Sequence, residues 1–265
     1  MNWKIFIITH GPIIEDYYIN DPLFSNIHYS FINVSNTPIS SAKFDILNIK
    51  DIENFIHLGK WYAEAEAIYN VYKNNLYNGY DYVGFIHWDY ELLSENVYFG
   101  YRVTSIIEKL IANQEKFVSF STYTFAEDYN QNIMMDLDFP NQLIGNGVNC
   151  WTEIISDYNE HFKANIDIDF LMTKRINLCS AFLCSIIVFN ELMDFYSKII
   201  ETRKLENYDT NHEYRFQGGM LERYIGCFSQ RYNLAELPLY HRWTGSLEES
   251  PKNRFRKIIN SIFKK

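Results

Sequence analysis

The chain has 265 residues, of which 47% are hydrophobic and 17% aromatic, and its formal net charge is −9. This length and hydrophobic content exclude a disordered protein and predict a globular one with a substantial core. The acidic charge argues against nonspecific nucleic-acid binding, and no apolar run approaches the roughly 20 residues that span a bilayer.

The cysteines and the N-terminal residues indicate a cellular compartment. The four cysteines show no CxxC pairing and no secreted-domain spacing, so we expect free thiols in the reducing cytoplasm. Only four apolar residues follow Lys4 before Thr9, which is too few for a secretory signal peptide.

The first half of the chain alternates predicted strands and helices. Buried strands are expected at residues 3–9, 28–34, 82–87 and 117–121, and amphipathic helices at 61–76 and 101–113. Ile68 and Tyr72 lie on the apolar face of the first helix, whereas Glu64 and Glu66 lie largely off it. Alternation of this kind predicts an α/β fold, with a mainly parallel central sheet flanked by helices.

The second half is more mixed. We expect a helix at 151–162, a buried strand over the long apolar run 176–189, and a helix at about 190–202. A further helix is expected over 216–228, with a tight turn at Gly218-Gly219 at its start, and an extended segment covers 232–239. Together these elements predict a single domain over 1–245 and a separate tail over 246–265.

Two acidic residues, Asp89 and Glu91, directly follow the buried strand 82–87. In an extended chain, side chains two residues apart point to the same face, about 6.6 Å apart along the strand. Both carboxylates can then converge on one cation at the carboxyl end of a strand, where α/β sheets bind ligands. Carboxylate oxygens suit Mg²⁺ and Mn²⁺, so the pair predicts a metal site that holds a diphosphate. The alternative is a solvated acidic turn.

Two other segments are weaker candidates. Asp136 and Asp138 form a second acidic triplet, a rival metal site that ranks below Asp89 and Glu91. Its place before Pro140 favours a loop or acceptor-side role. The loop that starts at His10-Gly11 can bring its backbone close to a nucleotide, but it lacks the GxGxxG pattern of dinucleotide-binding folds.

Several segments together resemble a known family. They are a first strand that ends in Thr9-His10, a helix with Glu and Trp/Tyr before Tyr-Lys-Asn, the Tyr-Asp-Tyr-Val-Gly-Phe-Ile-His segment, and Gly-Gly-Met-Leu-Glu-Arg at 218–223. Over most of residues 1–241 the chain resembles the glycosyltransferases of capsular and exopolysaccharide biosynthesis. That resemblance implies a GT-A-like (Rossmann-like) fold. Many members carry His-Tyr-Arg-Arg after the strand, whereas this chain has His-Trp-Asp-Tyr-Glu at 87–91, which implies a cation instead of basic residues.

The resemblance implies transfer of a sugar from a nucleotide-diphosphate sugar to a glycan or lipid-linked acceptor in surface polysaccharide synthesis. Mn²⁺ or Mg²⁺ would be held by Asp89 and Glu91, and by His241, because GT-A enzymes often add a C-terminal histidine ligand. The alternative for His241 is a surface histidine. The expected donor-binding residues are Thr9, His10, Gly11, His87, Trp88, Tyr90 and Arg242.

An inverting transferase needs a base that deprotonates the acceptor hydroxyl, and Glu222 is the candidate, as the resemblance covers this glutamate. The alternative is an acid that stabilises the start of its helix. Gly218 and Gly219 are expected on the acceptor side. A noncatalytic carbohydrate- or nucleotide-binding module, or a degenerate transferase, remains the competing function, and it would need neither the metal pair nor the base.

The tail over 252–265 carries six basic residues and no acid, whereas the rest of the chain, with 18 basic and 33 acidic residues, has a charge of −15. Its apolar residues, from Phe255 to Phe263, fall on one helical stripe, which suits an anionic membrane surface on the cytoplasmic side. The alternative is a helix that packs on the acidic body.

Overall fold

A computed structural model describes residues 1–19, 21, 23–94, 102–125, 143–144, 148–207 and 216–241. Asp136, Asp138, Arg242 and the tail over 246–265 therefore lie outside the described residues.

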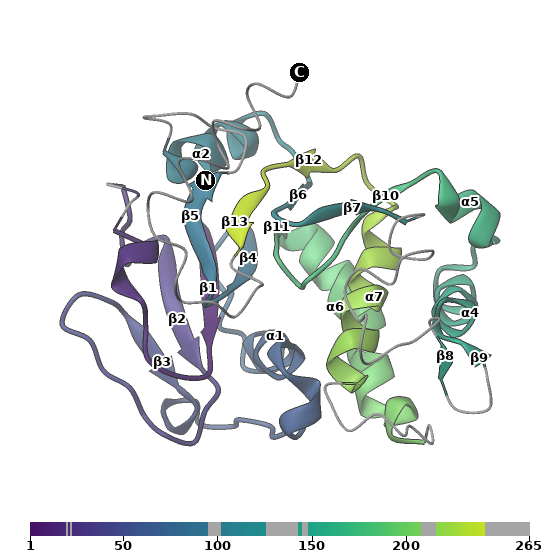
Figure 1. Cartoon of the computed structure of the whole chain (residues 1–265), viewed down its shortest axis with the longest axis horizontal. Helices are drawn as coiled ribbons and strands as arrows, with labels where there is room; N and C mark the ends of the chain where they lie inside the picture. The colour runs from purple at the N-terminus through teal and green to yellow at the C-terminus, as the bar shows by residue number, and fades with distance from the viewer. Residues whose placement is uncertain are drawn as a thin grey trace, which may run out of the picture.

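The core of the protein is a seven-stranded sheet with the order β12-β6-β11-β4-β1-β2-β3 (Figure 1). Its strands are β1 (Trp3–Thr9), β2 (Tyr29–Asn33), β3 (Ile46–Asn48), β4 (Tyr82–His87), β6 (Phe117–Ser119), β11 (Phe182–Ser185) and β12 (Ala235–Glu236). β11 runs antiparallel to β4 and β6, and every other pair is parallel. The predicted α/β fold with a mainly parallel central sheet is therefore confirmed.

Three short strand pairs lie outside this sheet. β10 (Arg175–Asn177) pairs with β7 (Thr122–Thr124), and β8 (Leu143–Ile144) pairs with β9 (Val148–Asn149). β13 (Leu239–His241) pairs antiparallel with β5 (Tyr90–Ser94), which directly follows the end of β4.

The helices are α1 (Glu64–Lys73), α2 (Val103–Ala112), α4 (Cys150–Phe162), α5 (Ile168–Met172), α6 (Ile186–Glu201) and α7 (Phe216–Ser229). Short 3-10 turns are η1 (Glu15–Tyr17), η2 (Ile49–Asp51), η3 (Lys60–Tyr62) and η6 (Lys204–Glu206). Helix α7 contacts α1, α4 and α6, and α6 contacts β4 and β11 (Figure 1). None of the helices within the described residues combines the length and hydropathy needed to cross a bilayer.

The two faces of the central strand β4 have different neighbours. Phe85 contacts Phe6 of β1, Phe182 of β11 and Phe189 of α6, so this face lies under α6. Side chains alternate along a strand, so His87 shares the face of Phe85, whereas Gly84 points to the other. A Cβ atom on Gly84 would lie 2.6 Å from the Phe182 carbonyl oxygen, so this close strand approach requires glycine.

The expectation of one strand over residues 176–189 is wrong. The run divides into β10, a turn in which Cys179 and Ser180 have positive φ angles of 61° and 48°, and β11. Helix α6 then begins at Ile186 rather than near residue 190. All these parts are largely buried, so the apolar residues show no periodicity that would distinguish the strands from the turn or the helix.

The expected turn at Gly218-Gly219 is also wrong, because both glycines lie inside α7 and Glu222 lies in its second turn. A Cβ atom on Gly218 would lie 3.1 Å from the Tyr62 carbonyl oxygen. The glycine therefore serves the close packing of α7 on η3.

Candidate functional site

Three buried side chains from distant parts of the chain meet at one end of the sheet. They are Glu64 of α1, His87 of β4 and Glu222 of α7, which are 5%, 5% and 6% exposed. Each offers one nitrogen or oxygen atom, and these atoms all lie within 4.8 Å of one another. We call this group the Glu64–His87–Glu222 cluster.

Strand register explains the position of the cluster. Phe6 and Ile8 of β1 pair with Phe85 and His87 of β4 in parallel register, so these residues share one face. His10, two residues beyond Ile8, reaches the same place: its Nε2 lies 3.5 Å from Glu64 Oε1, and His87 Nδ1 lies 3.7 Å from that oxygen. The His10 side chain is 43% exposed, so the cluster meets solvent on this side.

Tyr196 of α6 faces the same cluster. Its side chain is fully buried, and its hydroxyl has no hydrogen-bond partner among the described residues. Burial raises the pKa of Tyr196 well above its usual value, and the charges of Glu222 and Glu64 add to the shift. The hydroxyl therefore lies within electrostatic range of both carboxylates.

The Cys179 thiol connects the cluster with Asp89. Burial raises the pKa of this thiol, and the negative charges of Glu222 and Asp89 raise it further. Both carboxylates therefore lie in the surroundings of the Cys179 side chain. The high pKa keeps Cys179 protonated at neutral pH, which argues against a nucleophilic role.

The chain does not stay extended after β4, so the geometry expected for Asp89 and Glu91 is wrong. Trp88 and Asp89 form a turn before β5 begins at Tyr90. The Trp88 N–H donates to the Ile8 carbonyl at 2.8 Å, and the Tyr18 hydroxyl donates to the Trp88 carbonyl at 2.6 Å. This turn lets β5 leave the sheet and pair with β13.

Asp89 and Glu91 nevertheless share one neighbourhood. Asp89 is half-buried, and Glu91 is fully buried. Burial raises the pKa of Tyr18 well above its usual value, and the charges of Asp89 and Glu91 both contribute. Two carboxylates thus lie near one buried tyrosine hydroxyl.

The pairing of β13 with β5 brings His241 to this region. His241 pairs with Tyr90, and Tyr240 pairs with Glu91. The His241 backbone therefore lies beside the strand that carries Glu91.

The other predicted donor-side residues surround the ends of β1 and β4. Thr9 Oγ1 donates to the Gly11 carbonyl at 2.8 Å and fixes the turn after β1. Tyr90 is buried, and its ring meets the His87 ring edge-on with centroids 5.8 Å apart. Trp88 is half-buried in the turn after β4.

A cavity of about 320 Å³ lies beyond the carboxyl ends of β1 and β2. Glu66 helps to form it, because its Oε2 accepts hydrogen bonds from the Leu58 and Gly59 amides at 2.6 and 3.1 Å. The lining residues are His10, Val34, Asn36, His57, Gly59, Ala63 and Glu66.

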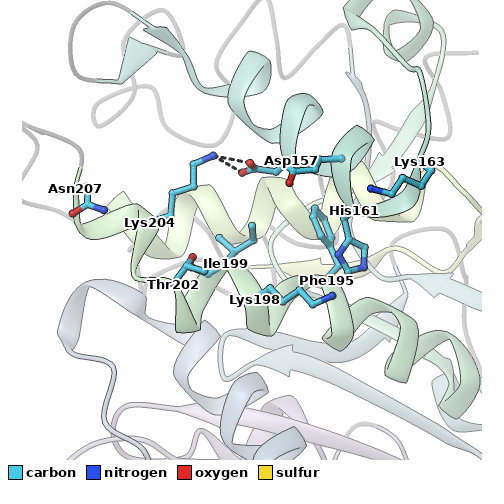
Figure 2. Close-up of a pocket in the computed structure, with 10 residues that line it drawn as sticks. Asp157, His161, Lys163, Phe195, Lys198, Ile199, Thr202, Lys204 and Asn207 are labelled. Carbon is cyan, nitrogen blue, oxygen red and sulfur yellow. Dashed lines mark hydrogen bonds and ion pairs between the residues drawn. The ribbon is translucent and has the colours of Figure 1, made fainter.

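A larger cavity of about 570 Å³ lies between α4, α6 and η6 (Figure 2). Its lining includes Lys204, which forms an ion pair with Asp157 at 2.6 Å, and His161. None of its lining residues belongs to the Glu64–His87–Glu222 cluster or to the predicted donor-binding set.

The sequence did not single out Glu64 or Tyr196. Glu64 lies in the first turn of α1, where the helix dipole favours any acid, so its position alone did not indicate a site. Glu64 and Glu66 were expected off the buried face of this helix, yet both are buried. The segment before α1 covers Glu66, whose Oε2 accepts hydrogen bonds from the Leu58 and Gly59 amides, and Glu64 lies beside His10 and His87.

No protein-family model matches the chain, and no curated protein sequence matches it. Among solved structures, the apo form of the bifunctional glycosyltransferase WbbM is similar, with 16% identity and a TM-score of 0.58. The match covers 90% of this chain and 45% of WbbM, so the chain spans less than half the length of that protein.

Two further structures match at lower similarity. Glucosyl-3-phosphoglycerate synthase from Mycobacterium tuberculosis, in complex with Mn²⁺, UDP and glucosyl-3-phosphoglycerate, has 12% identity and a TM-score of 0.41, over 99% of this chain and 79% of that one. The mannosyltransferase Ktr4p from S. cerevisiae has 12% identity and a TM-score of 0.38, over 90% and 70%. Of these, the likeness to WbbM establishes the fold, which is one that a glycosyltransferase also adopts.

Proposed function

We propose that this chain is a glycosyltransferase that moves a sugar from a nucleotide-diphosphate sugar to a glycan or lipid-linked acceptor. One observation carries the proposal: carboxylates and imidazoles gather at the carboxyl ends of β1 and β4. In the strand order, β2 lies on one side of β1 and β4 on the other. The crevice at such a switch point is the usual ligand site of an α/β sheet.

The donor would lie across this crevice. The cavity beside His10 and Asn36 has a volume of about 320 Å³, at the small end of ligand pockets, and suits the nucleoside. Asp89 and Glu91, together with His241, are the proposed ligands of Mn²⁺ or Mg²⁺. Two carboxylates near the Tyr18 hydroxyl fit a divalent cation, which when bound neutralises charge on the leaving diphosphate.

The same position of the donor in the crevice predicts its remaining contacts. The turn after β1 would bring its backbone to the diphosphate, and the side chains that end β4 would line the sugar. The proposed donor-binding residues are Thr9, His10, Gly11, His87, Trp88, Tyr90 and Arg242.

Glu222 is the proposed base for an inverting reaction. Its carboxylate is buried in the cluster with Glu64 and His87, and in this proposal it takes the proton from the acceptor hydroxyl. General base catalysis of this kind contributes about 10²–10⁴-fold to the rate. Asp136, Asp138, Gly218 and Gly219 remain proposals for the acceptor side. A role in surface polysaccharide synthesis rests on the family resemblance, and binding of the tail to an anionic membrane rests on its basic residues and apolar stripe.

A thermal-shift panel of nucleotide diphosphates and nucleotide sugars, with and without Mn²⁺, tests the proposal. A ligand that binds only the folded state stabilises it by about 2.7 kcal/mol at a hundredfold excess over Kd. We expect a shift with one nucleotide family that requires Mn²⁺, followed by sugar transfer to a suitable acceptor. No shift with any nucleotide, on protein shown to be folded, would favour the noncatalytic binding module.

A further inference from the structure

The Glu64–His87–Glu222 cluster has more ligand groups than a general base needs. With His10 it presents two carboxylates and two imidazoles around one point. Nitrogen and oxygen donors in this combination suit borderline transition metals, Zn²⁺ in particular.

The distances match those of a coordination shell. Ligand atoms about 2.1 Å from a tetrahedral zinc ion lie about 3.4 Å from one another. Here His10 Nε2 and His87 Nδ1 lie 3.5 and 3.7 Å from Glu64 Oε1, and the cluster atoms lie within 4.8 Å of one another. Small side-chain movements are therefore enough to form the shell.

One further observation points to a ligand. The Tyr196 hydroxyl is fully buried without a hydrogen-bond partner among the described residues, and it lies within electrostatic range of both glutamates. A bound ligand is one way to satisfy a buried hydroxyl of this kind.

We propose that Glu64, His87 and Glu222, with His10 on the solvent side, bind a transition-metal ion such as Zn²⁺. This site is separate from the Mn²⁺ or Mg²⁺ site that the proposed function assigns to Asp89 and Glu91. Its effect on the reaction rests on the proposed function: an ion on Glu222 occupies the lone pair that would accept the acceptor's proton. Zinc therefore inhibits transfer, whereas Mn²⁺ at the other site supports it.

The test is to measure the zinc affinity of the full chain, without nucleotide, by competition with a chromophoric chelator. We expect one zinc ion per chain. Glu64→Gln and His87→Asn each remove a direct ligand, so affinity should fall at least about tenfold, the loss that follows removal of even an outer partner. The matched control is His161→Asn, since His161 also faces a carboxylate, with its Nε2 3.3 Å from Asp194, but lies at the other cavity. It should leave the affinity unchanged.

Unchanged zinc affinity in both Glu64→Gln and His87→Asn would overturn the site. If either variant fails to fold, as judged by circular dichroism, His10→Asn replaces it, because an exposed side chain is tolerated more easily. We expect weaker binding in His10→Asn, and unchanged binding would count against the proposal. Co²⁺ gives a second readout, because its visible absorption changes when protein ligands coordinate it. We expect this change on addition of Co²⁺ to the wild-type protein and not to Glu64→Gln.

Asp89→Asn separates this inference from the proposed function. This variant should lose the Mn²⁺-dependent nucleotide shift and keep its zinc affinity. Zinc binding that depends on Glu64, in a protein that binds no nucleotide, would overturn the proposed function and leave the zinc site standing. Loss of zinc binding in Asp89→Asn would instead show that a single metal site serves both, which contradicts the inference.

Discussion

Gly84→Ala should destabilise the fold through a clash between β4 and β11. The added Cβ atom would lie 2.6 Å from the Phe182 carbonyl oxygen and 3.0 Å from Leu183 Cα. Both are backbone atoms of a central strand, so rotation of a side chain cannot relieve the contact. Overpacking costs about 1–3 kcal/mol of stability. Because the clash is with backbone atoms, we expect a cost near the top of that range. Alanine also lowers the conformational entropy of the unfolded chain, which offsets about 0.4–1 kcal/mol of this destabilisation.

The expected net loss is about 2 kcal/mol of unfolding free energy, or a fall in Tm of about 4–8 °C for a chain of this size. Urea denaturation and thermal melts followed by circular dichroism measure both quantities. Gly11→Ala is the control, because a Cβ atom there meets nothing within 4 Å, and its stability should change by less than about 1 kcal/mol. Equal Tm values for the two variants would refute the close β4–β11 register.

Three other predictions concern the site and the response to pH. Asp89→Asn should abolish the Mn²⁺-dependent nucleotide shift in a thermal-shift assay and leave the Tm without ligand nearly unchanged; a shift that persists would remove Asp89 from the metal site. Glu222→Gln should lower transfer by about 10²–10⁴-fold at unchanged nucleotide Kd, measured by calorimetry, and a weaker Kd without loss of transfer would contradict the base role. Burial, followed by the Glu206 carboxylate, raises the pKa of Tyr62 from 10.0 to about 12. The folded state then keeps a proton that the unfolded chain loses, so stability is fully present below about pH 10 and falls as the pH rises towards about 12. Urea unfolding across this range should show a shallower fall in Tyr62→Phe, and an identical fall would show that Tyr62 does not contribute.

Much of the fold could be predicted because its strands and helices have distinct apolar patterns. The strand expected at 28–34 is β2 (Tyr29–Asn33), and the helix expected at 101–113 is α2 (Val103–Ala112). The direction of β11 could not be predicted in this way. It depends on a reversal at Cys179 and Ser180 within a segment that is apolar throughout.

The candidate site was predicted in part, and the missing part depends on contacts between distant segments. His87 ends a recognisable strand, so the sequence indicated its place at the edge of the sheet. Glu64 is buried beside His87 of β4 and Glu222 of α7, and a helical pattern cannot reveal contacts with such distant segments. The turn at Trp88 and Asp89 leads into β5, which pairs with β13. These two strands lie far apart in the sequence, so their pairing could not be predicted from local patterns.

The position of β11 between β4 and β6 has a consequence for synthesis of the chain. The N-terminal segments leave the ribosome before the later ones during synthesis. Strands β1 to β4 can then pair among themselves while β11 has yet to be made, which leaves β4 as the edge of a partial sheet. That edge is apolar and presents unpaired backbone groups, the usual starting point for aggregation. β11 therefore covers the edge of β4, and until it is made β4 is exposed to pairing with other chains.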